Sequence, residues 1–244
     1  MPIRCCQNKF QVVQNVISTY PVLPQHILRV GKSYPAPIRG RLAGAPSARY
    51  APGMNIVLAS TSRYRRDLMT RLQIPFVAVS PGVEEAALPG EAPEAMATRL
   101  ATAKALAVAA IHPGAIVIGC DQVAVSEGRI LGKPGSHEVA LRQLRHLSAR
   151  EAVFHTALCV HNAPSDRTLT RMVDYRVKFR VLDDATIGRY LEREQPYDCA
   201  GSAKSEGLGI ALIERMEGED PNALIGLPLI ALVDLLRAHG VQVP

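Results

Sequence analysis

Residues 115–125 read AIVIGCDQVAV, and this nearly continuous apolar run decides the fold class. Such a run is typical of a strand that is buried on both faces, in a sheet that helices cover on either side. Shorter strand patterns precede it at 55–60 (NIVLAS) and 74–81 (IPFVAVSP). The run contains a single acid, Asp121. The stretch that predicts the central strand therefore also contains a candidate functional residue.

Helical and strand patterns alternate on both sides of this run. Hydroxyl residues at 60–62 offer N-caps to a helix that is expected to reach about Leu72, and Pro93 lies near the start of the longest helical pattern. Further helices are expected over 94–111, 136–148, 184–193 and 225–240, and long antiparallel strands over 151–162 and 167–182. The sequence therefore predicts an α/β fold with a mixed sheet and flanking helices.

The charges are unevenly distributed. The chain has 244 residues with 28 Lys and Arg against 22 Asp and Glu, but residues 1–53 hold seven of the basic residues and none of the acids. Residues 54–244 are close to neutral, which argues against nucleic-acid binding by this part, because that needs a basic face. No run approaches the roughly 18 apolar residues of a membrane span. We expect a soluble cytoplasmic protein with no membrane partner.

Residues 1–53 also contain seven of the 18 prolines and show little periodicity. This composition predicts a basic, Pro-rich N-terminal extension that is mostly disordered, followed by one domain over 54–244. Two alternatives stay open. An Arg-rich segment without acids resembles an organellar transit peptide, and a start codon assigned too far upstream is the other alternative, because Met54 directly precedes the first strand.

Asp121 is the first candidate site residue. An acid in a buried strand is costly unless it is paired or binds a metal. At the end of a parallel strand it would lie where open α/β sheets place their sites. Its carboxylate could activate a water as general base or anchor a metal ion. Gln122, beside it, offers both a donor and an acceptor to the edge of a base.

The segment ASTSRYRRDL (59–68) places a strand end before a helix N-terminus. Unpaired backbone N–H groups and the positive end of the helix dipole favour an anion there. Ser60 adds a hydroxyl donor, and Arg65 adds a planar fork that suits phosphate. Three arginines are unfavourable at a helix N-terminus without an anion, so this segment is a predicted phosphate site.

Other charged residues are weaker candidates. Lys133 stands between Gly132 and Pro134, a rigid turn that could aim its ammonium at a phosphate. Lys104 lies on the long helix and, taken alone, is better explained as a solvated charge. Glu84 and Glu85 are adjacent acids on a loop. Such a pair can hold Mg²⁺ together with substrate phosphates, although most adjacent acids are only solvated surface residues.

A glycine-bearing polar stretch, CAGSAKSEGLG (199–209), is a predicted ligand loop. Glu206 within it could accept hydrogen bonds from the N–H groups of a base. Other site classes lack support, since residues 54–244 contain no CxxC, P-loop, GxSxG or GxGxxG motif and no Cys/His cluster. Zinc sites, hydrolase triads and dinucleotide binding are not favoured, and the cysteines are expected to be reduced thiols.

In chain order these pieces resemble the Maf-like nucleotide pyrophosphatase family, over essentially all of 54–244. The matching motifs are LASTSRYRRDLMTRL (58–72), VEE (83–85), RLATAKA (99–105), IGCDQVAV (118–125), LGKP (131–134) and CAGSAKSEGLGIALIERMEGEDPNALIGLPLIAL (199–232). The last of these is especially similar to the branch that acts on 7-methyl-GTP. Three positions differ from the usual family pattern: the family commonly has Pro where this chain has Arg63, Trp where it has Tyr64, and Asp where it has Glu84.

The resemblance implies hydrolysis of a nucleoside triphosphate between its α and β phosphates, with a divalent cation (Mg²⁺ or Mn²⁺) as cofactor. Asp121 matches the proton acceptor, and the acidic pair, Glu84 and Glu85, takes the position of the metal ligands. The substrate-selecting positions are Tyr64, Gln122 and Glu206, and those around the triphosphate are Ser60, Arg65, Lys104 and Lys133. The implied fold resembles inosine-triphosphate pyrophosphatases: a long curved mixed sheet, two lobes around a cleft, and often a homodimer.

A guanine methylated at N7 is positively charged, so it should favour an aromatic face and a nearby carboxylate, here Tyr64 and Glu206. A pyrimidine or inosine triphosphate pyrophosphatase is the alternative within enzymes. A nucleotide-sensing or nucleic-acid-binding regulator, whose basic residues 1–53 contact polyanions, is the alternative from another class.

Overall fold

The computed structural model describes residues 55–243, and the predictions made for residues 1–53 lie outside them. Seven strands form one sheet: β1 (Asn55–Ala59), β2 (Val77–Val79), β3 (Ala115–Ser126), β4 (Arg129–Leu131), β5 (Glu151–Asn162), β6 (Arg167–Phe179) and β7 (Ile213–Gly218). The helices are α1 (Arg63–Thr70), α2 (Pro93–Ala109), α3 (His137–Leu147), α4 (Asp184–Glu194), α5 (Pro221–Ile225) and α6 (Leu229–Ala238). Short 3₁₀ helices are η1 (Ala163–Ser165), η2 (Ala200–Ser202) and η3 (Leu208–Leu212).

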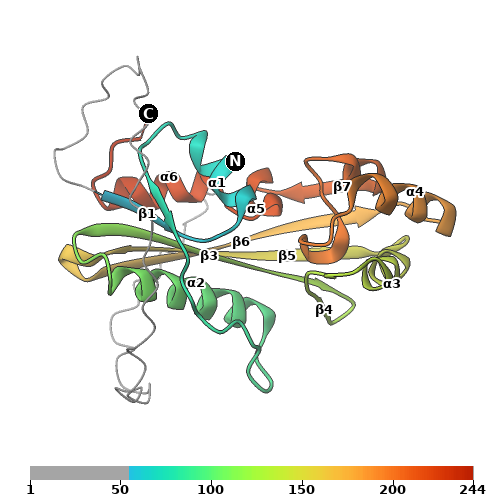
Figure 1. The fold of residues 1–244 in the computed structure, drawn as a ribbon, viewed down its shortest axis with the longest axis horizontal. Helices are drawn as coiled ribbons and strands as arrows, with labels where there is room; N and C mark the ends of the chain where they lie inside the picture. Colours follow the sequence, from blue (N-terminus) through green and yellow to red (C-terminus); the bar gives the residue numbers. More distant parts are fainter. Residues whose placement is uncertain (1–54, 244) are drawn as a thin grey trace, which may run out of the picture.

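The sheet is mixed, as predicted. Its strand order is β2-β1-β3-β5-β6-β7, with β4 pairing to β3. Strand β1 is parallel to both β2 and β3, whereas β3, β5, β6 and β7 are antiparallel to one another in turn. Figure 1 shows the long strands β3, β5 and β6 running through the whole molecule, so that one sheet supports both ends.

Helices cover both faces of the sheet. Helix α2 packs on one face, and α1, α5 and α6 lie over the other, while α3 and α4 lie at the far end of the long strands (Figure 1). The buried residues of that far end, including Phe154, Phe179 and Leu144, form a hydrophobic cluster of their own. The protein therefore has two lobes that share the long strands.

Side chains of β3 alternate between the two layers, as the pleat of a strand requires. Val117 and Val123 are buried with α2, whereas Ile116, Ile118 and Cys120 are buried with α6. The strand is buried on both faces along most of its length, which confirms the prediction from its apolar run. By the same alternation, Asp121 faces the α2 layer and Gln122 the opposite layer.

Helix α2 approaches β3 very closely. Small residues of the helix, Ala101 and Ala105, meet Gly119 of the strand at the contact. A Cβ atom built on Gly119 would collide with the carbonyl oxygen of Ala101 and would lie 2.8 Å from Ala105 N and 2.9 Å from Ala105 Cβ. Only glycine fits here, and the contact fixes the helix against the strand next to Lys104 and Asp121.

The edge of β3 has an unpaired stretch between two partners. Strand β1 pairs with β3 only as far as Ile118, and β4 pairs with it only from Ala124 onward. Within residues 55–243, no strand pairs with this edge of β3 between these two positions. We call this stretch the β3 gap; it opens the sheet at Asp121.

Most predicted elements are confirmed, and the strand expected over 151–162 has the predicted ends. Strand β2 is shorter than predicted, the helix predicted over 225–240 begins later, as α6, and a break separates it from α5, a short helix that was not predicted. The break follows from Gly226, whose φ of 119° ends α5, and from Pro228 at the N-cap of α6. Strand β7 was not predicted because its residues are nearly all exposed and its two apolar side chains, Ile213 and Met216, do not show the alternation that marks a strand.

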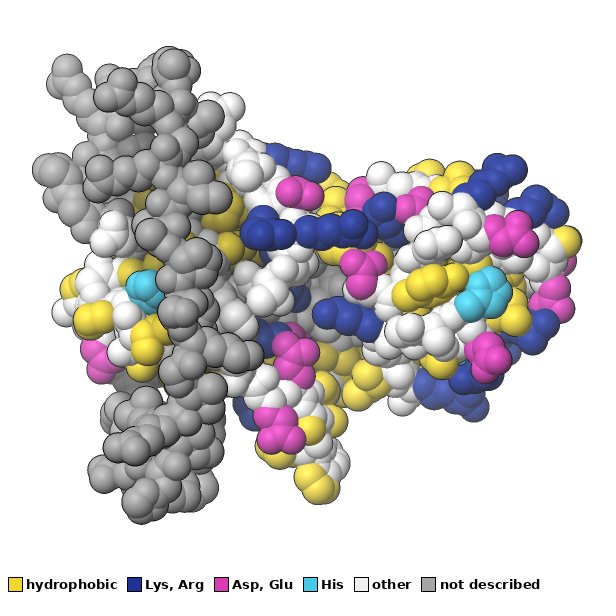
Figure 2. Space-filling model, in the orientation of Figure 1, with side chains coloured by type: hydrophobic (Ala, Val, Ile, Leu, Met, Phe, Trp, Pro, Cys, Tyr) yellow, Lys and Arg dark blue, Asp and Glu magenta, His cyan; other side chains and the backbone are white. Residues whose placement is uncertain are grey.

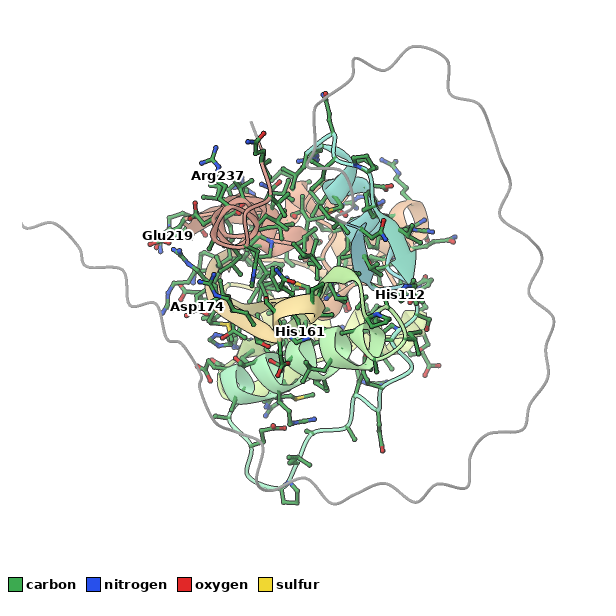
Figure 3. The ribbon with its side chains drawn as sticks, turned by 90° about the vertical axis from the view of Figure 1, so that its left-hand side faces the viewer. His112, His161, Asp174, Glu219 and Arg237 are labelled. Carbon is green, nitrogen blue, oxygen red and sulfur yellow. The ribbon has the colours of Figure 1, made fainter. Side chains whose placement is uncertain are left out.

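Two histidines beside α6 lie in positions that oppose protonation. His239 is buried, its Nε2 lies 3.2 Å from the carbonyl oxygen of Val160, and its Nδ1 has no hydrogen-bond partner among the described residues. His161, on β5 (Figure 3), forms a 2.8 Å hydrogen bond through Nδ1 to Thr168 Oγ1. Burial lowers the pKa of both histidines, and repulsion from Arg167 and His161 lowers that of His239 further.

These lowered pKa values predict a loss of stability in mild acid. Below the ordinary histidine pKa of about 6.5, the unfolded chain binds protons that the folded chain resists, so the free energy of unfolding falls as pH falls. We expect His239→Gln to lose less stability than the wild type between about pH 7.5 and about pH 5.5 in urea unfolding. The matched control is His112→Gln, at a partly exposed turn. Equal losses in wild type and His239→Gln would contradict the expectation.

Candidate active site

A cavity of about 590 Å³ opens at the β3 gap, between the two lobes. Its walls come from the end of β1 and the start of α1, from α2, from β3, from the loop after β4, from the loop after α4, and from the end of α5. Figure 2 shows Lys and Arg side chains, with Asp and Glu beside them, around the hollow between the lobes. Segments far apart in the sequence therefore meet in one polar cavity.

Nearly all the residues singled out from the sequence line this cavity. They are Ser60, Tyr64, Arg65, Glu85, Lys104, Asp121, Gln122, Lys133 and Glu206. Glu84 does not belong to the lining, and it is exposed. The ligand loop predicted over 199–209 contributes Cys199, Ala200 and Ala203 in addition to Glu206.

Asp121 lines the cavity. Its Oδ1 atom is 2.6 Å from Lys104 Nζ, and both side chains are almost fully buried. Lys104 comes from the α2 turn that the Gly119 contact presses against β3. The expectation that Asp121 ends a parallel strand was wrong: it lies within β3, three residues past the end of the parallel pairing with β1. The β3 gap, rather than a strand end, exposes it to the cavity.

A second carboxylate reaches the same ammonium. Glu85, from the loop before α2, forms an ion pair with Lys104 Nζ through Oε1. Burial opposes its ionisation, but the contact with Lys104, together with the charges of Lys133 and Arg65, lowers the pKa of Glu85. Glu85 is therefore held as a carboxylate, and Lys104 joins it to Asp121. Taken alone, Lys104 was expected to be a solvated charge. That expectation was wrong, because its side chain is buried and paired with two carboxylates.

The start of α1 has the expected hydroxyl caps. Ser62 is the N-cap, with Oγ accepting from Arg65 N at 3.4 Å, and the Oγ of buried Ser60 accepts from Ser62 N at 3.1 Å. Of the three arginines in this segment, Arg63 and Arg65 line the cavity and Arg66 does not. Arg65 lines the cavity and donates from Nε to the Gly226 carbonyl at 2.9 Å, whereas Arg66 is exposed and outside the lining.

Gln122 is held by the opposite layer. Its amide nitrogen donates to the carbonyl oxygens of Ala223 at 2.7 Å and Leu224 at 3.2 Å, and to Thr156 Oγ1 at 3.1 Å. The two amide protons are thus used within the protein, to fix α5 against β3. The expectation that Gln122 offers a donor as well as an acceptor to a base is therefore not met, since only its oxygen is left for a ligand.

Tyr64 and Arg63 form a cluster with a residue that the sequence analysis missed, Asp198. Tyr64 Oη donates to Asp198 Oδ1 at 3.1 Å, and Arg63 Nη2 donates to Tyr64 Oη at 2.6 Å. The Arg63 guanidinium lies 4.7 Å from the centre of the Tyr64 ring and 3.5 Å from Asp198 Oδ2. We call these three residues the mouth cluster. Asp198 directly precedes the predicted ligand loop, and this proximity was the available signal.

Two charged residues of the cavity are uncommitted. Among the described residues, neither the Lys133 ammonium nor the Glu206 carboxylate has a hydrogen-bond or ion-pair partner. Lys133 is exposed on the loop after β4 and lines the cavity. The cavity therefore offers one free cation and one free carboxylate to a ligand.

The predicted site for a divalent cation can be compared with the carboxylates that the structure brings together. Within residues 55–243, no group of three or more His, Cys, Asp and Glu side chains is placed to hold a metal ion. Asp121 and Glu85 nevertheless converge on one positive charge, the Lys104 ammonium. Mg²⁺ commonly uses one or two carboxylates together with waters and substrate phosphates. This pair fits that pattern, whereas the predicted pair of Glu84 and Glu85 does not share the cavity.

No helix within residues 55–243 has the length and apolar character needed to cross a membrane.

Similar proteins point to one family. The chain is 60% identical over 188 residues to the 7-methyl-GTP pyrophosphatase of Nitrosospira multiformis. This match covers 77% of this chain and 95% of that protein. It is 57% identical to the protein of the same name from Methylobacillus flagellatus, and this match covers 77% of this chain and 98% of that protein.

A solved structure with partial likeness is the nucleoside-triphosphatase, or dITP/XTP pyrophosphatase, of Mycobacterium abscessus. It has 20% identity and a TM-score of 0.34, and the match covers 52% of this chain and 74% of that one. The family model described as Maf-like protein matches residues 55–239, from the first residue of β1 to the end of α6. The chain therefore belongs to the Maf-like protein family.

Proposed function

We propose that this protein hydrolyses 7-methyl-GTP, or a similar modified nucleoside triphosphate, between the α and β phosphates to give the monophosphate and pyrophosphate. The observation that supports it most strongly is the buried Asp121, held at 2.6 Å by Lys104 in a cavity that also contains Arg65 and Lys133. The relatives named 7-methyl-GTP pyrophosphatase, at 57–60% identity, support the choice of substrate.

Asp121 would act as the general base. Lys104 binds Oδ1 and fixes the carboxylate, which leaves Oδ2 to accept a proton from the attacking water. Because the two residues come from tightly packed elements, the base is held in place before substrate binds. A fixed base avoids the cost of ordering it in the transition state.

The triphosphate would lie between the start of α1 and the loop after β4. Arg65 and Ser60, at the start of α1, and Lys133, on the loop after β4, all line the cavity. The backbone N–H groups at the start of α1 add further donors. These cations oppose the negative charge that collects on the phosphate oxygens during cleavage.

Asp121 and Glu85 would hold a divalent cation, Mg²⁺ or Mn²⁺. When bound, it would supply additional positive charge to the phosphate oxygens. Binding of a metal requires both carboxylates to be ionised, and Glu85 meets this condition through its lowered pKa. Lys104 keeps the two acids from repelling each other before the metal binds.

The base would lie toward the loop after α4. Tyr64 supplies an aromatic ring, and Glu206 supplies a carboxylate with no partner of its own among the described residues. A cationic base gains from both, which favours an N7-methylated guanine over a neutral base. Cytoplasmic location and a homodimer stay predictions.

A panel of nucleoside triphosphates tests the proposal. We expect purified protein to release pyrophosphate from 7-methyl-GTP with a higher kcat/KM than from GTP, ITP, UTP or CTP, and only with Mg²⁺ or Mn²⁺ present. A preference for ITP or a pyrimidine nucleotide would assign the chain to the alternative enzyme class. Tight nucleotide binding with no release of pyrophosphate would favour a regulator instead.

A further inference from the structure

The mouth cluster contains a cation that sits on an aromatic ring inside the cavity lining. All three of its residues, Arg63, Tyr64 and Asp198, line the cavity. The guanidinium covers the Tyr64 ring at 4.7 Å and faces the Asp198 carboxylate at 3.5 Å. A ring and a carboxylate together make a site for a planar positive charge.

The arginine is held in this site by contacts open to water, namely a 2.6 Å hydrogen bond to Tyr64 Oη and the ion pair with Asp198. The side chains of Arg63 and Asp198 are 61% and 53% exposed, and ion pairs so open to water contribute little. The Tyr64 ring and the Asp198 carboxylate are held by a separate contact, the 3.1 Å hydrogen bond between them. Burial raises the pKa of Tyr64, so its hydroxyl keeps the proton that it donates to Asp198. The site can therefore persist when the guanidinium leaves.

An N7-methylated guanine has the properties of the group that now fills this site. Like guanidinium, it is planar and its positive charge is delocalised over nitrogen atoms. Both can lie flat on an aromatic ring, and both are attracted by a carboxylate. A neutral guanine gains the stacking on Tyr64 but has no net charge for Asp198 to attract.

We propose that Tyr64 and Asp198 form a cation site which Arg63 fills when no ligand is bound and which the positively charged base of the substrate takes over. Asp198 is then a specificity-determining residue, and Arg63 is an internal competitor of the base. The choice of base rests on the proposed function, but the cation site itself makes a prediction about binding without turnover.

Nucleosides without phosphates isolate the base end of the cavity. Calorimetry would compare 7-methylguanosine, a cation, with neutral guanosine on wild type and on Asp198→Asn. We expect the wild type to prefer 7-methylguanosine, and Asp198→Asn to reduce that preference about tenfold, mainly by weakening the cation. The matched control is Asp67→Asn, an exposed acid of α1 outside the cavity lining, which should keep the preference of the wild type.

Removal of the competitor should have the opposite effect. We expect Arg63→Ala to bind 7-methylguanosine about threefold more tightly than the wild type, because the site no longer has to be vacated. Arg66→Ala, an exposed arginine of the same helix outside the lining, should leave the affinity unchanged. With 7-methyl-GTP as substrate, these changes should appear in KM rather than in kcat.

Two results would overturn the proposal. One is an unchanged nucleoside preference in Asp198→Asn, and the other is weaker binding of 7-methylguanosine by Arg63→Ala, which would make Arg63 a direct ligand contact. Failure of the wild type to hydrolyse any triphosphate would instead refute the proposed function. The nucleoside preference would still be measurable in that case, so the two failures are distinguishable.

Discussion

Asp121→Asn is expected to lower kcat for pyrophosphate release by about a thousandfold while leaving the fold intact. Asparagine has the same shape as aspartate but cannot accept a proton from water. Lys104 keeps Glu85 as an ion-pair partner in the variant, so no buried charge is left without compensation. The loss should therefore appear in the rate and not in the melting temperature.

The measurement is pyrophosphate release under saturating 7-methyl-GTP, together with a thermal unfolding curve for each protein. Asp174→Asn is the matched control, since Asp174 is an exposed acid of β6 outside the cavity lining (Figure 3). It should retain the wild-type rate. Residual activity in Asp121→Asn above about a tenth of wild type would refute the role of Asp121 as general base.

Gly119→Ala is expected to cost about 3 kcal/mol of the free energy of unfolding. The added methyl group meets backbone atoms of α2, namely Ala101 O and Ala105 N, and these cannot rotate away as a side chain can. Helix α2 must therefore move from the sheet, which opens the core between them. The same movement carries Lys104 away from Asp121, so activity should also fall under conditions where the variant is folded.

Urea unfolding gives the stability of this variant, and pyrophosphate release gives its activity. Gly114→Ala is the control, because a Cβ on Gly114 would meet nothing within 4 Å and its φ is not in the left-handed region. It should change the free energy of unfolding by less than about 0.5 kcal/mol. An unfolding midpoint for Gly119→Ala equal to that of the wild type would mean that α2 yields easily, and the close packing would then not fix Lys104.

Much of the fold and most of the site could be predicted from local patterns. The apolar run of β3 indicates burial on both faces, and the pleat alternation places Asp121 and Gln122 on opposite faces of the strand. That alternation alone could have indicated that Gln122 contacts the other layer. The motif residues were found because their chemistry is unusual for their local setting, as with an acid in a buried strand or arginines at a helix start.

What could not be predicted depends on relations between distant segments. The β3 gap arises because β1 ends before β4 begins to pair, and no single strand pattern contains that difference in register. Asp198 was missed because its partners, Arg63 and Tyr64, are more than a hundred residues away in the sequence. Glu84 resembled Glu85 in sequence, and only the path of the loop shows that one faces Lys104 and the other lies outside the cavity.

The β3 gap also bears on how this sheet avoids aggregation. Unpaired strand edges are templates on which another polypeptide can add a strand. Here the open edge is recessed between two lobes, with η2 and the start of α1 beside it. A foreign strand has no straight path to that edge, whereas a small molecule does. The protein can thus keep backbone hydrogen-bonding groups available in the middle of its sheet without inviting self-association there.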